Sequence, residues 1–197
     1  MEKAPLSRRD ELLDLAATMF AERGLRATTV RDIADSAGIL SGSLYHHFKS
    51  KEQMVEEVLR DFLDWLFERY AEIVASESDP LERVKGLFMT SFEAIEHRHA
   101  QVVIYQDEAK RLSSLPQFDF VDARNREQRR MWVEVLKQGV AEGRFRPDID
   151  VDLVYRFIRD TTWVSVRWYQ PGGPLTAEQV GQQYLSIVLG GITKEGV

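Results

Sequence analysis

The sequence predicts an all-α protein of about nine helices, with an N-terminal domain of three helices over residues 1–52 and a larger helical domain over residues 53–197. Apolar residues recur at helical spacing along nearly the whole 197-residue chain, and no segment shows the alternation that is typical of a strand. Helix-start signals recur between these stretches: a Ser, Thr or Asp is followed three residues later by an acidic or amide residue.

The composition restricts the class of protein. The chain contains no cysteine, which excludes a disulfide framework and a thiolate zinc site. We see no signal peptide and no apolar run of about 18 residues, so we expect a soluble cytoplasmic protein without a membrane partner. The net charge is −6, yet residues 1–55 carry eight basic and eight acidic side chains. An acidic body with a neutral head suits a protein that touches nucleic acid at one end.

The first helices are the most informative part of the chain. Ser7 is expected to cap a helix that ends at Gly24, and Thr29 with Asp32 forms a capping box for the next helix. Gly38 can adopt the left-handed conformation that ends that helix. We expect Ser41 to cap a second short helix over 42–47, whose outward side chains suit a major groove: Ser43, Tyr45, His46 and His47. Two short helices joined in this way are typical of a helix-turn-helix.

The remaining helices follow in order. Ser50 and Gln53 form a capping box that places Lys51 in the first turn, where a DNA phosphate is a natural partner. The candidate DNA contacts also have a plainer interpretation: His46 and His47 suit a solvated surface, and Lys51 suits an ordinary charged surface. The later helices are expected over these ranges: 51–75, 80–97, 100–112, 119–142, 151–169 and 177–193.

The N-terminal residues resemble the TetR family of bacterial repressors. The resemblance rests on Arg9, 20–24, Thr28-Thr29-Val30, Ile33-Ala34, Ala37-Gly38, 44–48 and 50–52. It implies a homodimer whose N-terminal domains bind a palindromic operator, and a C-terminal domain for ligand binding and dimerisation that releases the DNA. By position it carries over these DNA contacts: Thr29, Arg31, Ser41, Ser43, Tyr45, His46, His47 and Lys51. Ser41 stands where the family often has Lys or Arg.

The last two helices are the expected dimer interface. In the last helix, apolar positions share one face: Val180, Tyr184, Ile187, Val188 and Gly191. The helix before it has a wide apolar arc. Two such helices from each of two chains make a four-helix interface, as the family resemblance implies. The alternative is that both faces are buried within one chain.

A cluster of arginines around a tryptophan marks the opposite arc of the helix over 151–169. Arg156, Arg159, Trp163 and Arg167 are surface neighbours at helical spacing. In a structural interpretation Trp163 packs beneath the arginines by cation–π contact, and the arginines pair with acidic neighbours: Asp107, Glu108, Glu134 or Asp160. In a functional one, they bind an anionic ligand while the indole stacks on a flat group. Aromatic residues elsewhere are expected to line the cavity: Phe92, Tyr105 and Trp132.

The run over residues 157–169 resembles a narrower group of the same family, the actinobacterial repressors of ring-degradation genes in cholesterol catabolism. That resemblance implies a coenzyme A thioester of a steroid-ring fragment as the effector, an acyl-CoA. Regulation of a fatty-acid or multidrug response by another lipophilic ligand is the alternative. We expect no enzyme, no cofactor and no metal, because the chain has no Gly-rich phosphate loop, no G-x-S-x-G and no H-E-x-x-H. An interaction module that never meets DNA leaves the outward polar helix unexplained.

Overall fold

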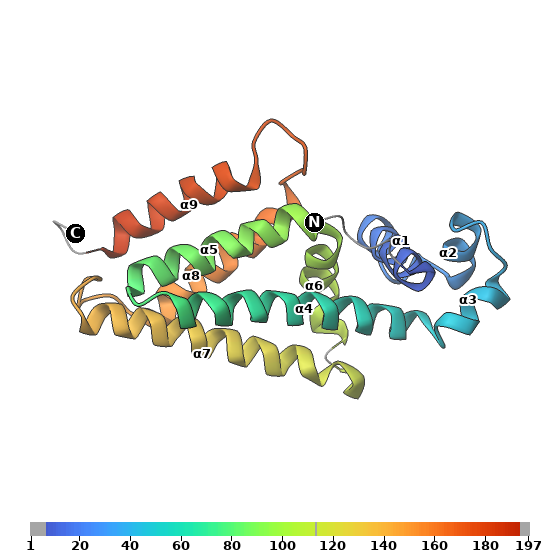
Figure 1. The fold of residues 1–197 in the computed structure, drawn as a ribbon, viewed down its shortest axis with the longest axis horizontal. Coiled ribbons are helices and arrows are strands. Elements are labelled where there is room, and N and C mark those ends of the chain that lie inside the picture. The colour runs from blue at the N-terminus through green and yellow to red at the C-terminus, as the bar shows by residue number, and fades with distance from the viewer. Residues whose placement is uncertain (1–6, 113, 194–197) are drawn as a thin grey trace.

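The computed structural model describes residues 7–112 and 114–193, and within them the protein is all-α, as the sequence predicts (Figure 1). Nine α-helices and two short 3-10 helices follow one another in the described part of the chain: α1 Arg8–Arg23, α2 Val30–Ser36, α3 Ser41–His47, α4 Lys51–Ser76, α5 Pro80–His97, α6 His99–Leu112, η1 Pro116–Phe118, α7 Asp119–Ala141, α8 Val151–Val164, η2 Ser165–Arg167 and α9 Ala177–Ile192. None of these helices is long and apolar enough to cross a membrane.

Side-chain caps fix most of the helix starts. Ser7, Thr29 and Thr176 each form a reciprocal capping box. The box predicted for Ser50 and Gln53 is incomplete, because Ser50 accepts the Gln53 N–H but the Gln53 side chain accepts the N–H of Lys49 instead. Each box satisfies backbone N–H groups of the first turn, which otherwise have no partner within the helix. Asp79 and Asp150 cap α5 and α8 by accepting N–H groups of the first turn, without the reciprocal bond of a capping box. These starts are local features of the chain, which explains why the sequence predicts them.

Two predicted helix ends are wrong. Ser41 was expected to be the N-cap of α3, but it is the first helical residue and Leu40 occupies the cap position without a side-chain hydrogen bond. The helix expected to reach Tyr169 ends at Val164 and tightens into η2. The backbone N–H groups of Trp168 and Tyr169 both donate to the Ser165 carbonyl, and Tyr169 is buried against Glu96 of α5. We attribute the early end of α8 to this contact between Tyr169 and Glu96.

The long helix α4 joins the two ends of the molecule (Figure 1). Helices α1–α3 form a small unit at one end, and α4 runs from this unit into the body formed by α5–α9. Its 26 residues span about 39 Å at 1.5 Å per residue. The predicted boundary between residues 52 and 53 falls in the first turn of α4. In the body, α5 packs against α4, α7, α8 and α9 and forms the centre of the core.

Candidate DNA-reading face and ligand pocket

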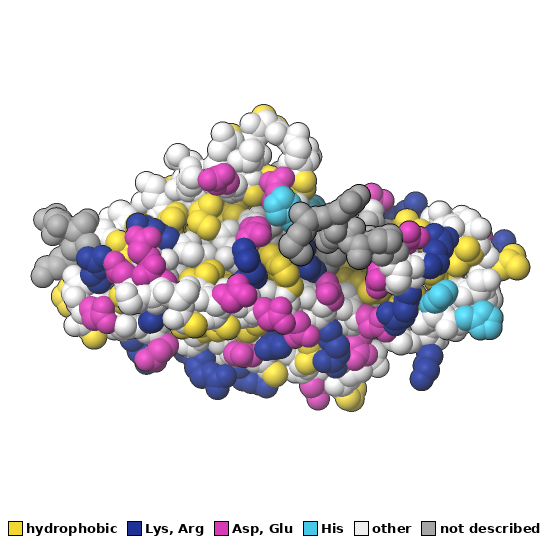
Figure 2. Space-filling model, in the orientation of Figure 1, with side chains coloured by type: hydrophobic (Ala, Val, Ile, Leu, Met, Phe, Trp, Pro, Cys, Tyr) yellow, Lys and Arg dark blue, Asp and Glu magenta, His cyan; other side chains and the backbone are white. Residues whose placement is uncertain are grey.

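Helix α3 lies at the opposite end of the molecule from the last turn of α9 (Figure 1). Leu44 and Phe48 are buried and hold α3 on the core. The side chains between them point outward: Tyr45 is 55% exposed, and His46 and His47 are exposed as well. Figure 2 shows His and several basic side chains at this end, whereas acidic side chains spread over the body. The face is therefore available to a polyanion.

A shallow groove of about 450 Å³ runs beside Tyr45. It gathers four of the eight predicted DNA contacts: Thr29, Arg31, Tyr45 and Lys51. Lys49 also lines it, although it is not among the eight predicted contacts. The other four predicted contacts lie outside the groove along α3: Ser41, Ser43, His46 and His47. Of these, Ser41 is half-buried and the rest are exposed.

Two of the predicted DNA contacts already have partners inside the protein. The Thr29 hydroxyl accepts a hydrogen bond from the Asp32 N–H at 3.1 Å and donates to its carboxylate at 2.6 Å. The hydrogen bonds from Thr29 hold the pKa of Asp32 below its ordinary value. The Lys51 ammonium donates to the backbone carbonyls of Leu25 at 2.6 Å and Thr28 at 3.1 Å. Arg31, by contrast, is highly exposed and lies 3.7 Å from Asp35.

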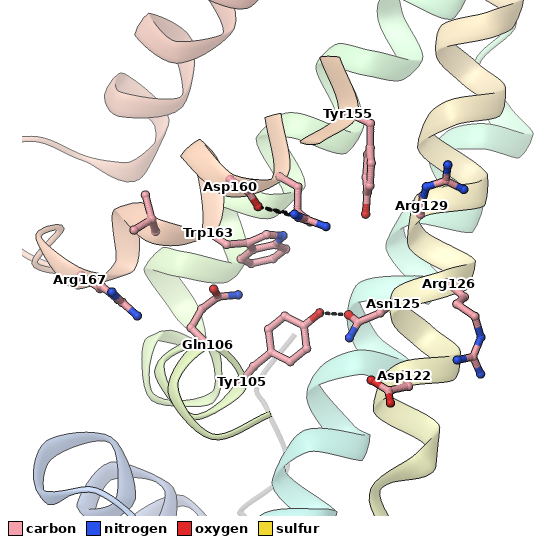
Figure 3. Close-up of a pocket in the computed structure, with 12 residues that line it drawn as sticks. Tyr105, Gln106, Asp122, Asn125, Arg126, Arg129, Tyr155, Asp160, Trp163 and Arg167 are labelled. Carbon is pink, nitrogen blue, oxygen red and sulfur yellow. Dashed lines mark hydrogen bonds and ion pairs between the residues drawn. The ribbon is translucent and has the colours of Figure 1, made fainter. Parts of the chain in front are cut away.

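A pocket of about 780 Å³ opens between α6, α7 and α8 (Figure 3). Four of the seven predicted ligand contacts line it: Tyr105, Arg159, Trp163 and Arg167. The other three lie elsewhere. Arg156 is exposed outside the pocket, and Trp132 is buried edge-on against Tyr70 with 6.4 Å between the ring centres. Phe92 lines a separate cavity of about 790 Å³ between α5 and α9.

Trp163 forms part of the inner wall of this pocket. Its indole is 3% exposed and meets the rings of Phe62 and Tyr105 edge-on, with ring centres 6.4 and 6.2 Å away. Tyr105 reaches across the pocket and donates its hydroxyl to the Asn125 side-chain oxygen (Figure 3). The aromatic rings make this wall flat and largely apolar, and the Tyr105 hydroxyl is already hydrogen-bonded. Trp163 therefore does not pack beneath the arginines, as one interpretation of the sequence expected.

Arginine dominates the charge of the pocket. Four arginines line it against two aspartates: Arg126, Arg129, Arg159 and Arg167, with Asp122 and Asp160. Arg159 pairs with Asp160 at 2.7 Å, which raises the pKa of its guanidinium, and Arg167 pairs with Asp107 at 3.3 Å. The Arg159 guanidinium also lies over the Tyr155 ring, 5.8 Å from its centre. Arg159 and Arg167 thus have acidic partners, but their side chains are 39% and 63% exposed and so remain available to an anion.

Sequence reasoning chose Trp132 on α7 and missed the residues of this helix that line the pocket. Asp122, Asn125, Arg126 and Arg129 line the pocket from this helix, and Tyr155 lines it from α8. The four α7 positions are spaced three, four and seven residues apart, so they share one polar face. That periodicity was a usable signal, but nothing local says which helix covers this face. Burial raises the pKa of both Tyr105 and Tyr155, so their hydroxyls stay neutral and able to donate hydrogen bonds.

Exposed apolar side chains lie on α8, on the segment after it and on α9. Phe157 is 54% exposed, Val164 43%, Trp168 50% and Ile187 68%. The predicted single apolar face of α9 is divided, however. Val180 and Val188 are buried within this chain, and Tyr184 is half-buried beneath Trp168. Ile187 and Gly191 remain outward.

The fold and the α3 face define a helix-turn-helix regulator with a separate C-terminal helical domain, rather than an enzyme. The chain belongs to the TetR family. Residues 12–58 match the family model for bacterial regulatory proteins of the tetR family. Residues 77–192 match that for the tetracyclin repressor-like C-terminal domain.

Individual relatives agree with this assignment. The chain is 83% identical to the HTH-type transcriptional repressor KstR2 of Mycolicibacterium smegmatis over 190 residues, which cover 96% of this chain and 93% of that protein. It is 61% identical to the repressor of the same name from Rhodococcus jostii over 185 residues, covering 94% and 91%. The solved structure of the ketosteroid transcriptional regulator KstR2 of Mycobacterium tuberculosis superposes with a TM-score of 0.96 at 77% identity, covering 97% of each chain.

Proposed function

We propose that the protein is a ligand-responsive transcriptional repressor that binds a palindromic operator as a homodimer. The single observation that carries the DNA-binding part is the outward face of α3, where Tyr45 and two histidines are exposed beside a basic groove. Two such faces enter successive major grooves when they lie about 34–36 Å apart. Arg31, Tyr45 and Lys49 contact the operator, and Ser43, His46 and His47 reach the base edges.

The homodimer forms through α8 and α9. An isolated chain that exposes Phe157, Trp168 and Ile187 leaves large apolar side chains in water, which an interface between two copies would cover. A two-fold axis through this surface pairs the same patch on both chains. It also leaves the α3 end of each chain free to face the duplex.

The effector is a coenzyme A thioester of a steroid-ring fragment, of the kind that cholesterol catabolism produces. The pocket supports this proposal because it combines two chemistries in about 780 Å³. Its excess of arginine suits the phosphates of coenzyme A. The aromatic wall of Trp163 and Tyr105 suits an apolar ring system. The relative named a ketosteroid regulator is 77% identical to this chain in a structural superposition.

Helix α6 is the element through which the pocket reaches the DNA-binding unit. Tyr105 and Gln106 face the pocket, while Glu108, one turn along, accepts a hydrogen bond from the Leu25 N–H at 3.4 Å. Lys51 of α4 holds the carbonyl of the same Leu25. A ligand that displaces α6 therefore moves the loop between α1 and α2, because Glu108 of α6 and Lys51 of α4 both bind Leu25 of that loop. It releases the DNA only if it binds the displaced state more tightly.

A regulator of a fatty-acid or multidrug response is the alternative. Receptors of lipophilic cations need buried carboxylates to bind positive charge. The pocket has twice as many arginines as aspartates, which argues against a cation. A fatty acyl-CoA shares the phosphate chemistry, so the experiment must compare acyl groups.

The first experiment tests DNA binding. The purified protein is mixed with the promoter region beside its own gene, and a gel shift is measured at several salt concentrations. We expect a shift whose affinity falls steeply with salt, because phosphate contacts release counterions. A protein that binds this fragment no better than unrelated DNA would refute the repressor proposal.

The second experiment tests the effector. Steroid-ring and straight-chain acyl-CoA thioesters are titrated into the operator complex, and release is followed by fluorescence anisotropy. We expect the steroid-ring thioester to act at lower concentration, and Arg159→Ala to need about tenfold more of it. The Trp163→Phe variant, which keeps an aromatic ring in the wall, should still be released by the steroid-ring thioester, but more weakly than the wild type. Arg156→Ala is the matched control, because Arg156 lies on the same helix outside the pocket.

If Arg159→Ala is released at the same concentration as Arg156→Ala, the pocket is not the effector site. Equal release of the wild type by straight-chain thioesters would leave the site intact but contradict the steroid-ring assignment.

A further inference from the structure

Leu40 is a large apolar side chain at the DNA-facing end that makes almost no contact with its own protein. It precedes α3 in an extended conformation, with φ −72° and ψ 144°. Its side chain is 80% exposed, the highest exposed fraction among the large hydrophobic residues that the structure describes. The neighbouring Ile39 packs partly against the core, so the turn does not need Leu40 for its packing.

The choice of leucine at this position is locally unfavourable. An N-cap is best filled by Ser, Thr, Asp or Asn, whose side chains bind the free N–H groups of the first turn. Side chains of these types cap six of the described helices: α1, α2, α4, α5, α8 and α9. Phe118 precedes α7 without a cap, but it is fully buried and so contributes to the core. Leu40 supplies neither a cap nor core packing.

Residues that break a local rule without a structural gain are expected where function requires them. Leu40 is continuous with the outward face of α3, because its carbonyl accepts the N–H of Ser43 at 2.9 Å and that of Leu44 at 3.3 Å. Because it directly precedes α3 and its side chain faces solvent, Leu40 lies beside any groove that α3 enters. The C5-methyl of thymine is the apolar group that the major groove offers.

We propose that Leu40 is a specificity-determining residue that packs against a thymine methyl in each half-site of the operator. This inference rests on the proposed DNA-binding function and adds to it a residue that reads sequence without hydrogen bonds. It gives the face two kinds of contact, because polar side chains such as Ser43 and His47 bind base edges while Leu40 selects thymine at one position. The contact excludes water from both the leucine and the methyl group.

The test uses a duplex that the wild-type protein selects from a random-sequence library. Each thymine of this duplex is replaced in turn, symmetrically in both half-sites, by deoxyuridine, which lacks only the methyl group. We expect one position at which the wild type binds about fourfold more weakly per half-site, the value for one buried methyl group, or about fifteenfold for the dimer. Affinity is measured by fluorescence anisotropy at a fixed salt concentration.

Leu40→Ala should bind the thymine duplex more weakly than the wild type and should lose no further affinity on deoxyuridine at that position. Leu40→Gln, which keeps the length of the side chain but is polar, should show the same insensitivity. Leu115→Ala is the matched control, because Leu115 is also exposed but lies between α6 and η1. Circular dichroism verifies that each variant is folded.

The proposal is overturned if Leu40→Ala binds as tightly as Leu115→Ala, or if deoxyuridine weakens both proteins equally at every position. A selected site on which no thymine is sensitive would overturn it as well. A wild-type protein that selects no sequence at all would instead refute the proposed function, so the two failures are distinguishable.

Discussion

The Lys51 side chain gives the sharpest prediction about stability, because its ammonium is bound inside the protein. It donates to the carbonyls of Leu25 at 2.6 Å and Thr28 at 3.1 Å, and both of these residues are buried. These bonds tie the first turn of α4 to the loop between α1 and α2. Replacing Lys51 by methionine keeps the aliphatic stem and removes only the ammonium donors.

The expected loss follows from the strength of such bonds. A hydrogen bond to a charged group contributes about 1.5–3 kcal/mol, and because Lys51 is half-exposed we take about 2 kcal/mol for the two together. For a chain of this size, that corresponds to a fall in Tm of about 6 °C. The measurement is thermal unfolding followed by circular dichroism, at a concentration well above any dimer dissociation constant.

Lys49→Met is the control for charge. The Lys49 side chain is exposed beside the same groove, so its loss should change the free energy of unfolding by less than about 0.5 kcal/mol. In DNA binding we expect the opposite order, with Lys49→Met more affected than Lys51→Met. Loss of the Lys49 phosphate contact should make the affinity for DNA fall less steeply with salt. If Lys51→Met melts together with Lys49→Met, the two carbonyl bonds do not hold the loop.

Three further predictions concern the body. Tyr70→Phe deletes a buried hydroxyl that lies 2.6 Å from Ser91 Oγ, and should lower the free energy of unfolding in urea by about 1–2 kcal/mol; an unchanged midpoint would show that the bond contributes nothing. Gly139→Ala places a methyl group on the Phe145 ring and should lower it by about 1–3 kcal/mol, whereas Gly190→Ala, which meets nothing within 4 Å, should not. The Glu96 carboxylate accepts hydrogen bonds from the Tyr169 hydroxyl and the Ala177 N–H, which hold its pKa below 4.5. Since the folded pKa is lower than the unfolded one, this stabilisation is present at neutral pH and is lost as the pH falls below about 4.5. The difference in stability between wild type and Glu96→Gln should therefore shrink between about pH 5 and pH 3, and a difference that stays constant over this range would contradict the assignment.

Local signals in the sequence were sufficient for most of the fold. The capping boxes at Ser7, Thr29 and Thr176 involve residues three apart, so their partners are visible in the sequence. The end of α8 was not predictable in this way. It depends on Tyr169 binding Glu96, a residue 73 positions away, and no local pattern records that contact.

The proposed DNA-binding face and the proposed ligand pocket differ in predictability for the same reason. Residues 28–51 form the proposed DNA-binding face within one short segment, so a linear motif describes nearly all of it. The pocket combines α6, α7 and α8, and helical spacing identified only the cluster of Arg159, Trp163 and Arg167 in one stretch of the chain. Asn125 and Tyr105 meet only because α6 and α7 pack together. Leu40 is the reverse case: its position was plain in the sequence, but only its 80% exposure shows that an apolar residue there has no structural purpose. The residues of a site that forms by tertiary packing can therefore be identified only once the fold is known. The fold is also needed to recognise that a residue such as Leu40 is exposed without a structural role.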